Sequence, residues 1–352
     1  MCAERTDHHT VVDHPLASVV VATYRRPRVL RDTLCGLQAQ QMDPPDTFEV
    51  VVIDNDPAQS AGAVVAELKA GWPQTVRLHY VPESRLGLSY ARNRGIDEAR
   101  GDVIAFLDDD VFVSPTWLRA MLQCFKRTES VCVGGRTLIQ WEGDPELVVQ
   151  ACADRLLGFD LGEIDLPIRG RQTPGGGNSA FRRKVFENGM RFSTDLGRVG
   201  KILLSGEDTE LMARLKQAGQ PIWYCAAALV HHRTGGQPLT RKRVVRQRYW
   251  FGISHAIVDQ RLYGKRYQLT RAAARAAKAL LVDVPRWCFG VVACSPGRRL
   301  IAGCSLAKQT GYVAASLSLV SALNRVAAER QSDPGARVVD GLGNQGNRVM
   351  AP

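Results

Sequence analysis

The sequence predicts an α/β protein with a wound, mainly parallel sheet, followed by a helical and strongly basic C-terminal region. Short β-branched runs recur through the first half of the chain, and patterns of helical spacing separate them. Such alternation is typical of wound α/β folds, and near-continuous apolar runs indicate strands that are buried on both faces. Positive charge gathers only after residue 233.

The elements can be placed in order along the chain. The runs predicted as strands span 18–23, 49–54, 76–81, 103–108 and 131–135. Apolar residues recur at helical spacing after the first strand (29–37) and after the fourth (117–125). The Gly-rich segment 158–181 is irregular, and we expect a mobile loop over a site. A helix (207–217), a strand (221–230) and a helical region (241–326) complete the order.

Composition and length limit the possible classes of protein. The 352 residues are 45% hydrophobic and 23% charged, as in ordinary soluble globular proteins. Nine scattered cysteines indicate small buried residues in a reducing compartment. No apolar stretch reaches the roughly 18 residues of a membrane span, and the N-terminus has no signal-peptide core, so we expect a cytoplasmic protein. We predict a flexible N-terminus (1–16), a wound α/β domain (17–240), a basic helical region (241–330) and a disordered tail (331–352).

Polar clusters follow three of the predicted strands. They are "TYRRP" (23–27), "DND" (54–56) and "DDD" (108–110). In wound sheets, ligands bind outside the carboxyl ends of the strands. Three clusters at one sheet edge therefore indicate a binding site.

The aspartate triplet needs a positive partner. Adjacent carboxylates raise one another's pKa, and a hard divalent cation would offset their charge. In an extended segment Asp108 and Asp110 point to one side and Asp109 to the other, so Asp108 and Asp110 are placed to share a metal. The alternative is a turn before a helix that starts at Ser114 and Pro115, where acids suit the helix dipole.

Three later clusters each allow two interpretations. Arg85, Arg92 and Arg94 either meet anionic oxygens or lie on a solvated helix. Asp208 is either a general base at a helix N-terminus or the partner of Ser205 in a capping box. A histidine of the pair that ends "ALVHH" (228–232) either contacts a metal or phosphate or is structural.

In this order the clusters resemble a family 2 glycosyltransferase of the GT-A fold. The resemblance covers about residues 17–255, on "VVVATYRRPRVLRDTL", "VVVIDND", "SRLGLSYARNRGIDEARGDVIAFLDDDVFVSPTWL", "GGGNSAFRR", "SGEDTELMARLKQAG" and "AALVHHRTGG". It implies a GT-A sheet and transfer of a sugar from a UDP- or GDP-linked donor, with inversion and with a divalent metal, Mn²⁺ or Mg²⁺. The acceptor would be a glycan or a lipid-linked sugar.

The resemblance also assigns residues by motif match. Asp208 would be the catalytic base. Asp110 and His232 would bind the metal. Residues on the acceptor side would be Gly177, Asn178 and Glu207. The nucleotide-sugar donor would contact Thr23, Tyr24, Arg25, Asp54, Arg92, Asn93, Asp108 and Asp109.

Two features depart from the processive members of that family. The segment "RQRYW" (246–250) lacks the arginine before tryptophan that a Q-x-x-R-W motif requires, and flanking transmembrane helices are missing from the sequence. Both features favour addition of one or a few sugars over extrusion of a polymer.

The basic segment needs its own explanation. Residues 233–299 contain fifteen Lys or Arg and two acids, so the local balance is +13 and the remainder of the chain is about −2. Arg271, Arg275 and Lys278 share one side of a predicted helix, which faces either an anionic surface, such as the inner membrane leaflet, or solvent. An alternative class is a non-catalytic binder of nucleotide sugars, polyanions or nucleic acid. Since recognised nucleic-acid motifs are missing, we expect no nucleic-acid partner.

Overall fold

The computed structural model describes residues 14–199, 202–234 and 239–332, with the backbone alone at 154–155 and 318–332. The predicted flexible N-terminus and disordered tail fall almost wholly outside these residues. The strands are β1 (Ala17–Thr23), β2 (Phe48–Asp54), β3 (Arg77–Pro82), β4 (Val103–Asp108), β5 (Val111–Val113), β6 (Cys132–Gln140), β7 (Leu166–Pro167), β8 (Asn178–Arg182) and β9 (Ile222–Arg233). The helices of the first 220 residues are α1 (Pro27–Gln38), α2 (Gly62–Lys69), α3 (Leu88–Glu98), α4 (Trp117–Arg127), α5 (Leu147–Leu157), α6 (Lys184–Glu187) and α7 (Glu207–Gln217).

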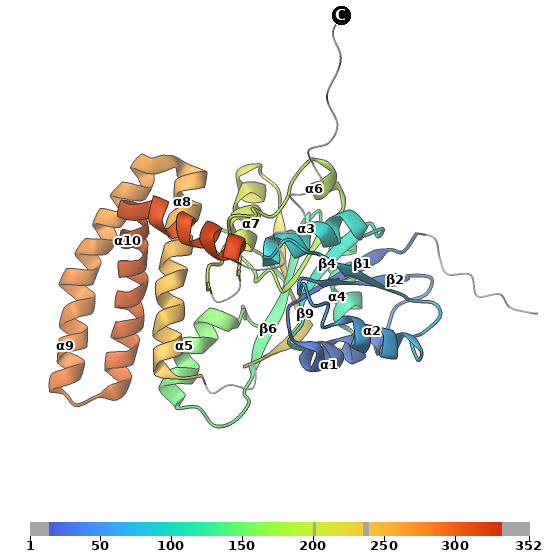
Figure 1. The fold of residues 1–352 in the computed structure, drawn as a ribbon, viewed down its shortest axis with the longest axis horizontal. Coiled ribbons are helices and arrows are strands. Elements are labelled where there is room, and N and C mark those ends of the chain that lie inside the picture. Colours follow the sequence, from blue (N-terminus) through green and yellow to red (C-terminus); the bar gives the residue numbers. More distant parts are fainter. Residues whose placement is uncertain (1–13, 200–201, 235–238, 333–352) are drawn as a thin grey trace, which may run out of the picture.

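These strands form one mixed sheet in the order β3-β2-β1-β4-β8-β6-β9-β5, with β7 paired to β9 (Figure 1). The four strands from β3 to β4 are parallel, as predicted. The prediction of an irregular loop over 158–181 was wrong at its end, because β8 runs antiparallel between β4 and β6. A five-residue strand that follows three glycines leaves little periodicity to detect.

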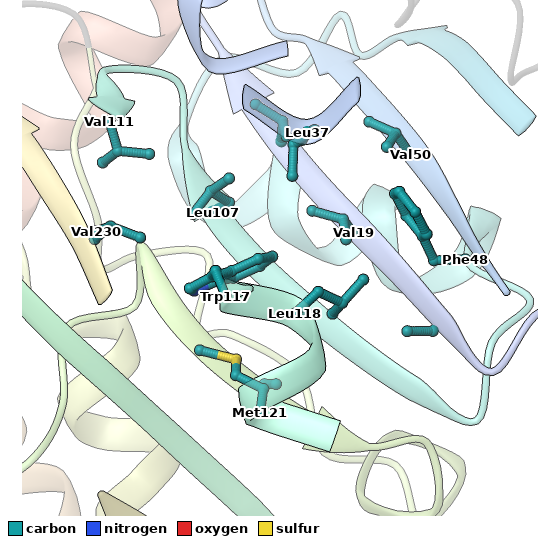
Figure 2. Packing of buried hydrophobic residues seen from close by; sticks show 14 of the residues in the cluster. Val19, Leu37, Phe48, Val50, Leu107, Val111, Trp117, Leu118, Met121 and Val230 are labelled. Carbon is teal, nitrogen blue, oxygen red and sulfur yellow. The ribbon is translucent and has the colours of Figure 1, made fainter. Parts of the chain in front are cut away.

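Helices cover both faces of the sheet, which explains the unbroken apolar runs. Val19 and Val21 of β1 pack with α1, α2 and α4, whereas Val20 between them packs with α3, α6 and α7. Figure 2 shows the first of these cores, where fully buried Trp117 and Leu118 of α4 lie under the central strands. Each fully buried side chain of this size adds about 1.5–3 kcal/mol relative to exposure. This core fixes the strand ends that carry the polar clusters.

The C-terminal region is helical, as predicted. It comprises α8 (Arg241–Lys278), a π-helical turn η1 (Ala279–Asp283), α9 (Val284–Val292) and α10 (Pro296–Ser332). Helix α8 breaks at Gly264, whose φ of 83° suits glycine. α8 and α10 pack side by side (Figure 1), and their Ile253, Ile257 and Tyr312 share a core with Leu86 and Leu196 of the sheet domain. The domain boundary at 240 stays a prediction.

The residues of the basic stripe have partners within the protein. Arg271 pairs with Asp259, Arg275 donates to Gln309 Oε1 at 2.7 Å, and Lys278 donates to both oxygens of Asp283 at 2.9 Å. The side chains of Arg271 and Lys278 are nevertheless 37% and 44% exposed, so the choice between an anionic surface and solvent stays a prediction. Among the helices of the described residues, none combines the length and the hydropathy that a membrane span requires.

The cysteine prediction holds in part. Cys124, Cys132, Cys152, Cys225 and Cys304 are buried, but Cys35, Cys288 and Cys294 are exposed. All eight are free thiols. Cys124 and Cys225 also lie close to Asp165, which their distant positions in the sequence did not indicate.

Candidate active site

The aspartate triplet follows β4 at the carboxyl edge of the parallel strands. Between it and α4 lies strand β5, and α4 starts at Trp117 after Thr116, without a side-chain cap and without acids in its first turn. The alternative of a helix-capping turn at Ser114 is therefore wrong. Because the triplet does not cap this helix, we interpret it as part of a binding site at the sheet edge.

Asp108 and Asp110 lie together, as predicted, although Asp109 and Asp110 form a turn between β4 and β5 and not an extended segment. Asp108, Asp110 and His232 place one ligand atom each within 4.8 Å of one another. The Nε2 atom of His232 lies 3.4 Å from Asp110 Oδ1, and its buried Nδ1 has no hydrogen-bond partner among the residues described. β5 pairs with β9 and thereby brings His232 to the triplet. Two carboxylates and an imidazole form a donor set that fits Mn²⁺ or Mg²⁺.

Asp109 points the other way, into the protein. Its Oδ2 accepts a hydrogen bond of 2.6 Å from the hydroxyl of Thr23. Burial and, next, the charge of Asp110 raise the pKa of Asp109 to about 7. Arg26, which the motif match did not select, donates to Asp110 Oδ2 at 2.7 Å and lies 3.4 Å from Asp109 Oδ1. The sequence feature that could have indicated Arg26 is its place as the second arginine of "TYRRP", directly after the first strand.

Arg92 joins the triplet to the first turn of α7. Its guanidinium donates to Glu207 Oε1 at 2.7 Å and to Asp108 Oδ1 at 3.2 Å, and it packs over the ring of Phe192. Burial alone would lower the pKa of Arg92, but the carboxylates of Glu207, Asp108 and Asp208 raise it. Burial, with the nearby charge of Asp208, raises the pKa of Glu207 to about 7. Arg92 thus holds two acidic groups from separate elements in one place.

The glycine loop before β8 lies against both acidic groups. A Cβ atom at Gly177 would stand 1.9 Å from the Asp108 carboxyl carbon, and one at Gly176 would stand 2.9 Å from Asp208 Cβ. The Gly176 N–H donates to Asp208 Oδ2 at 2.7 Å. Only glycine allows this backbone to approach so closely.

Asp208 does not belong to a capping box. Helix α7 begins after Gly206 without a side-chain cap, and the hydroxyl of Ser205 lies 3.3 Å from that of Ser254 in α8. The capping alternative is therefore wrong. The half-buried Asp208 carboxylate accepts hydrogen bonds from the backbone N–H groups of Gly176 and Thr209.

Three residues predicted to contact the donor or acceptor form hydrogen bonds within the protein. Asp54 is fully buried and accepts bonds from its own loop and from the Tyr80 hydroxyl. The side-chain amide of Asn93 donates to the carbonyl of Phe192 and accepts from the N–H of Phe192. Asn178 is also buried. Its amide accepts a hydrogen bond from the indole N–H of α4 and donates to backbone carbonyls of β6 and β9. Contact of these three side chains with a donor or acceptor stays a prediction.

The remaining arginines of the predicted clusters differ in their partners. Arg85 pairs with Glu83 and Arg94 with Glu98, so of the three arginines considered only Arg92 enters the site. Arg25 has a φ of 56°, packs over Tyr24 and donates to Asp56 at 3.1 Å. The Tyr24–Arg25 pair therefore borders the same edge as the triplet.

Comparisons with known proteins agree with this arrangement. The family model described as "Glycosyl transferase family 2" matches residues 18–190. The chain is 30% identical to the succinoglycan biosynthesis protein ExoM of Rhizobium meliloti (strain 1021) over 274 residues, or 76% of this chain and 84% of that protein. It is 27% identical to the glucosyl-dolichyl phosphate glucuronosyltransferase of Haloferax volcanii over 253 residues, or 69% and 77% of the two chains.

A solved structure has the same fold. It is the mannosyltransferase PcManGT from Pyrobaculum calidifontis in complex with GDP-Man and Mn²⁺, with a TM-score of 0.55, 18% identity, and coverage of 87% of this chain and 88% of that chain. Fold and site thus define a glycosyltransferase of the GT-A fold. With its 30% identity across most of both chains, the protein belongs to glycosyl transferase family 2.

Proposed function

We propose that this glycosyltransferase moves a hexosyl group from a UDP- or GDP-linked sugar to an acceptor hydroxyl with inversion, adding one or a few sugars. The observation that carries the proposal is the placement of two carboxylates, Asp108 and Asp208, against the adjacent Gly177 and Gly176 of one loop. We assign Asp108, with the rest of the triplet, to the diphosphate. We assign Asp208 to the incoming hydroxyl.

Asp208 is the proposed general base. Its Oδ2 accepts one backbone N–H from Gly176 and retains lone pairs for a proton from the acceptor. As that proton leaves, the acceptor oxygen bonds to the anomeric carbon, while the bond from that carbon to the diphosphate oxygen breaks. The single displacement from the opposite face inverts the configuration. Base catalysis of this kind contributes about 10²–10⁴ in rate.

The leaving diphosphate would lie at the triplet. A divalent metal held by Asp108, Asp110 and His232 would supply positive charge that stabilises the departing oxygens. The guanidinium of Arg26 adds a fixed positive charge beside Asp110. Support for Mn²⁺ and a nucleotide donor comes from the complex of the structural neighbour, whose title names GDP-Man and Mn²⁺.

The acceptor is proposed to be a glycan or a lipid-linked sugar, used in cell-envelope polysaccharide synthesis at the inner face of the membrane. The names of two relatives, which specify succinoglycan biosynthesis and a glucosyl-dolichyl phosphate, support this class. The chain would be cytoplasmic and bind the membrane peripherally.

A donor screen and one substitution test the proposal. Thermal shifts with UDP, GDP and their sugars, with and without Mn²⁺, should show stabilisation by one nucleotide in the presence of metal. With that donor, Asp208→Asn should fold normally and lose at least about 10²-fold in turnover. Asp144→Asn, on an exposed loop, is the matched control. Stabilisation by no nucleotide, or near-normal turnover of Asp208→Asn, would overturn the proposal.

A further inference from the structure

A second group of side chains with metal-binding chemistry lies apart from the aspartate triplet. Among the residues described, the side chains that could hold a metal ion fall into two groups, and one of them is the group at the triplet. The other comprises Cys124, Asp165 and Cys225, whose two sulfur atoms and one carboxylate oxygen lie within 4.8 Å of one another. The function proposed above uses none of these three residues.

Three separate elements bring this second group together. Cys124 lies near the carboxyl end of α4, Cys225 lies in β9, and Asp165 directly precedes β7, which pairs with β9. The pairing of β9 with β6 is interrupted after Cys225. There the N–H of Ala226 donates to Asp165 Oδ1 at 2.8 Å, and Arg127 of α4 donates to Asp165 Oδ2 at 2.5 Å. The carboxylate is therefore oriented beside the two thiols before any ion binds.

The two thiols are withdrawn from water. Cys124 is 0% exposed and Cys225 is 1% exposed, whereas the side chain of Asp165 is 26% exposed. The two thiols hydrogen-bond one another, and the N–H of Ala228 donates to the Cys225 sulfur. An N–H donor favours the ionised form of the thiol, which is the form that binds metals. An ion can enter from the side of the carboxylate.

These ligands suit a soft cation. Thiolates select Zn²⁺ and similar ions, whereas Mg²⁺ and Mn²⁺ prefer oxygen. With Zn–S bonds of about 2.3 Å in a tetrahedral site, the ligand atoms would stand about 3.5–3.8 Å apart, so atoms within 4.8 Å of one another need to move by only about 1 Å. Two thiolates and a carboxylate exceed the charge of Zn²⁺ by one. Arg127 supplies the balancing positive charge.

The second group is too far from the triplet to share a ligand with it. On β9, Cys225 lies opposite Gly135 of β6, and His232 lies opposite Ile139. Four residues of β6 therefore separate the two positions, or about 13 Å at about 3.3 Å per residue. An ion between the thiols would contact neither the triplet nor His232.

We propose that Cys124, Asp165 and Cys225 bind Zn²⁺, at a site distinct from the proposed catalytic metal site. The ion links α4 and the segment before β7 to β9. Both thiols lose their protons to solvent when the ion binds, so its affinity rises with pH. The second oxygen of Asp165 or a water molecule takes the fourth position of the tetrahedron.

A titration of the full chain with Cd²⁺ tests the site. The chain is first treated with a chelator and kept reduced. Cd²⁺ bound to thiolates gives a charge-transfer absorption band, which the triplet cannot give because it contains no sulfur. The band should saturate at one equivalent of Cd²⁺. Zn²⁺ should remove the band by displacement, and excess Mg²⁺ should not. Absence of the band, or equal displacement by Mg²⁺, would overturn the proposal.

Two cysteine variants locate the ion. Cys124→Ser and Cys225→Ser should each weaken Cd²⁺ binding at least about tenfold, because loss of even an outer partner of a metal ligand costs about 10–100-fold in affinity. Cys132→Ser, which also removes a buried thiol, and Cys35→Ser, which removes an exposed one, should leave the band unchanged. A band that persists in both Cys124→Ser and Cys225→Ser would refute the location.

A carboxylate variant keeps the test independent of changes in the core. Asp165→Asn should weaken Zn²⁺ binding at least about tenfold, measured by competition with Cd²⁺. Glu163→Gln, which alters a carboxylate of the same loop that is 85% exposed, is the matched control. Equal Zn²⁺ affinity in the two variants would exclude Asp165 as a ligand and contradict the proposed site. These measurements use neither donor nor turnover, so their outcome is separate from that of the transferase proposal.

Discussion

Gly177 shows how one residue can determine the geometry of the donor side. A methyl group there would overlap the Asp108 carboxyl group, whereas a Cβ at Gly175 meets nothing within 4 Å. Gly177→Ala should therefore displace Asp108 and reduce turnover at least about tenfold, since a misplacement of 1 Å can cost about 10²-fold. Steady-state kinetics of Gly177→Ala and Gly175→Ala would compare the two. Equal turnover would show that the close approach to Asp108 does not matter for activity.

At this scale, the sequence predicts the direction of a side chain better than its partner. The predicted grouping of Asp108 with Asp110, apart from Asp109, is found, but the backbone at 109–110 is a turn and not the extended segment on which the prediction relied. Asn93 and Asn178 also matched a motif, yet their amides bond the protein interior. An amide that binds a backbone carbonyl and one that binds a sugar have the same local sequence. Only the contacts that the amide makes in the folded structure distinguish the two roles.

The crossing of α8 and α10 depends on glycine. A Cβ at Gly311 would stand 2.1 Å from the Tyr249 carbonyl oxygen, while one at Gly303 of the same helix has its nearest neighbour at 4.0 Å. In an isolated helix, alanine is favoured over glycine by about 1 kcal/mol. Gly303→Ala should therefore raise the midpoint of thermal unfolding, and Gly311→Ala should lower it, because overpacking costs about 1–3 kcal/mol. Shifts of the same sign in both variants would contradict this account.

Elements were predicted more reliably than the surfaces that they cover. Helical spacing placed Arg271, Arg275 and Lys278 on one side of a helix, and they lie on one side. Periodicity cannot say what packs there, and α10 and η1 supply Gln309 and Asp283. β8 was missed for a related reason, because its place between β4 and β6 comes from long-range pairing and not from a local pattern.

For the whole molecule, the excess positive charge has to be explained together with exposed apolar side chains. η1 and α9 expose Leu280, Leu281, Trp287, Phe289, Val291 and Val292. Basic residues with exposed apolar side chains are typical of helices that lie on an anionic membrane. Because the stripe of α8 is paired within the protein, this apolar surface is the face on which we expect the membrane to lie.

Sedimentation with phosphatidylglycerol vesicles tests that face. Leu281 and Val292 are 76% and 82% exposed, and each side chain buried in a bilayer adds about 1.5–3 kcal/mol. The double variant Leu281→Ser/Val292→Ser should bind vesicles at least about tenfold more weakly. Leu147→Ser/Ile164→Ser, equally exposed (81% and 77%) but outside η1 and α9, should bind as the parent chain does. Binding should also weaken as salt rises and the Debye length falls from about 30 Å at 0.01 M to about 10 Å at 0.1 M. If the parent chain fails to sediment at low salt, this face does not bind membranes.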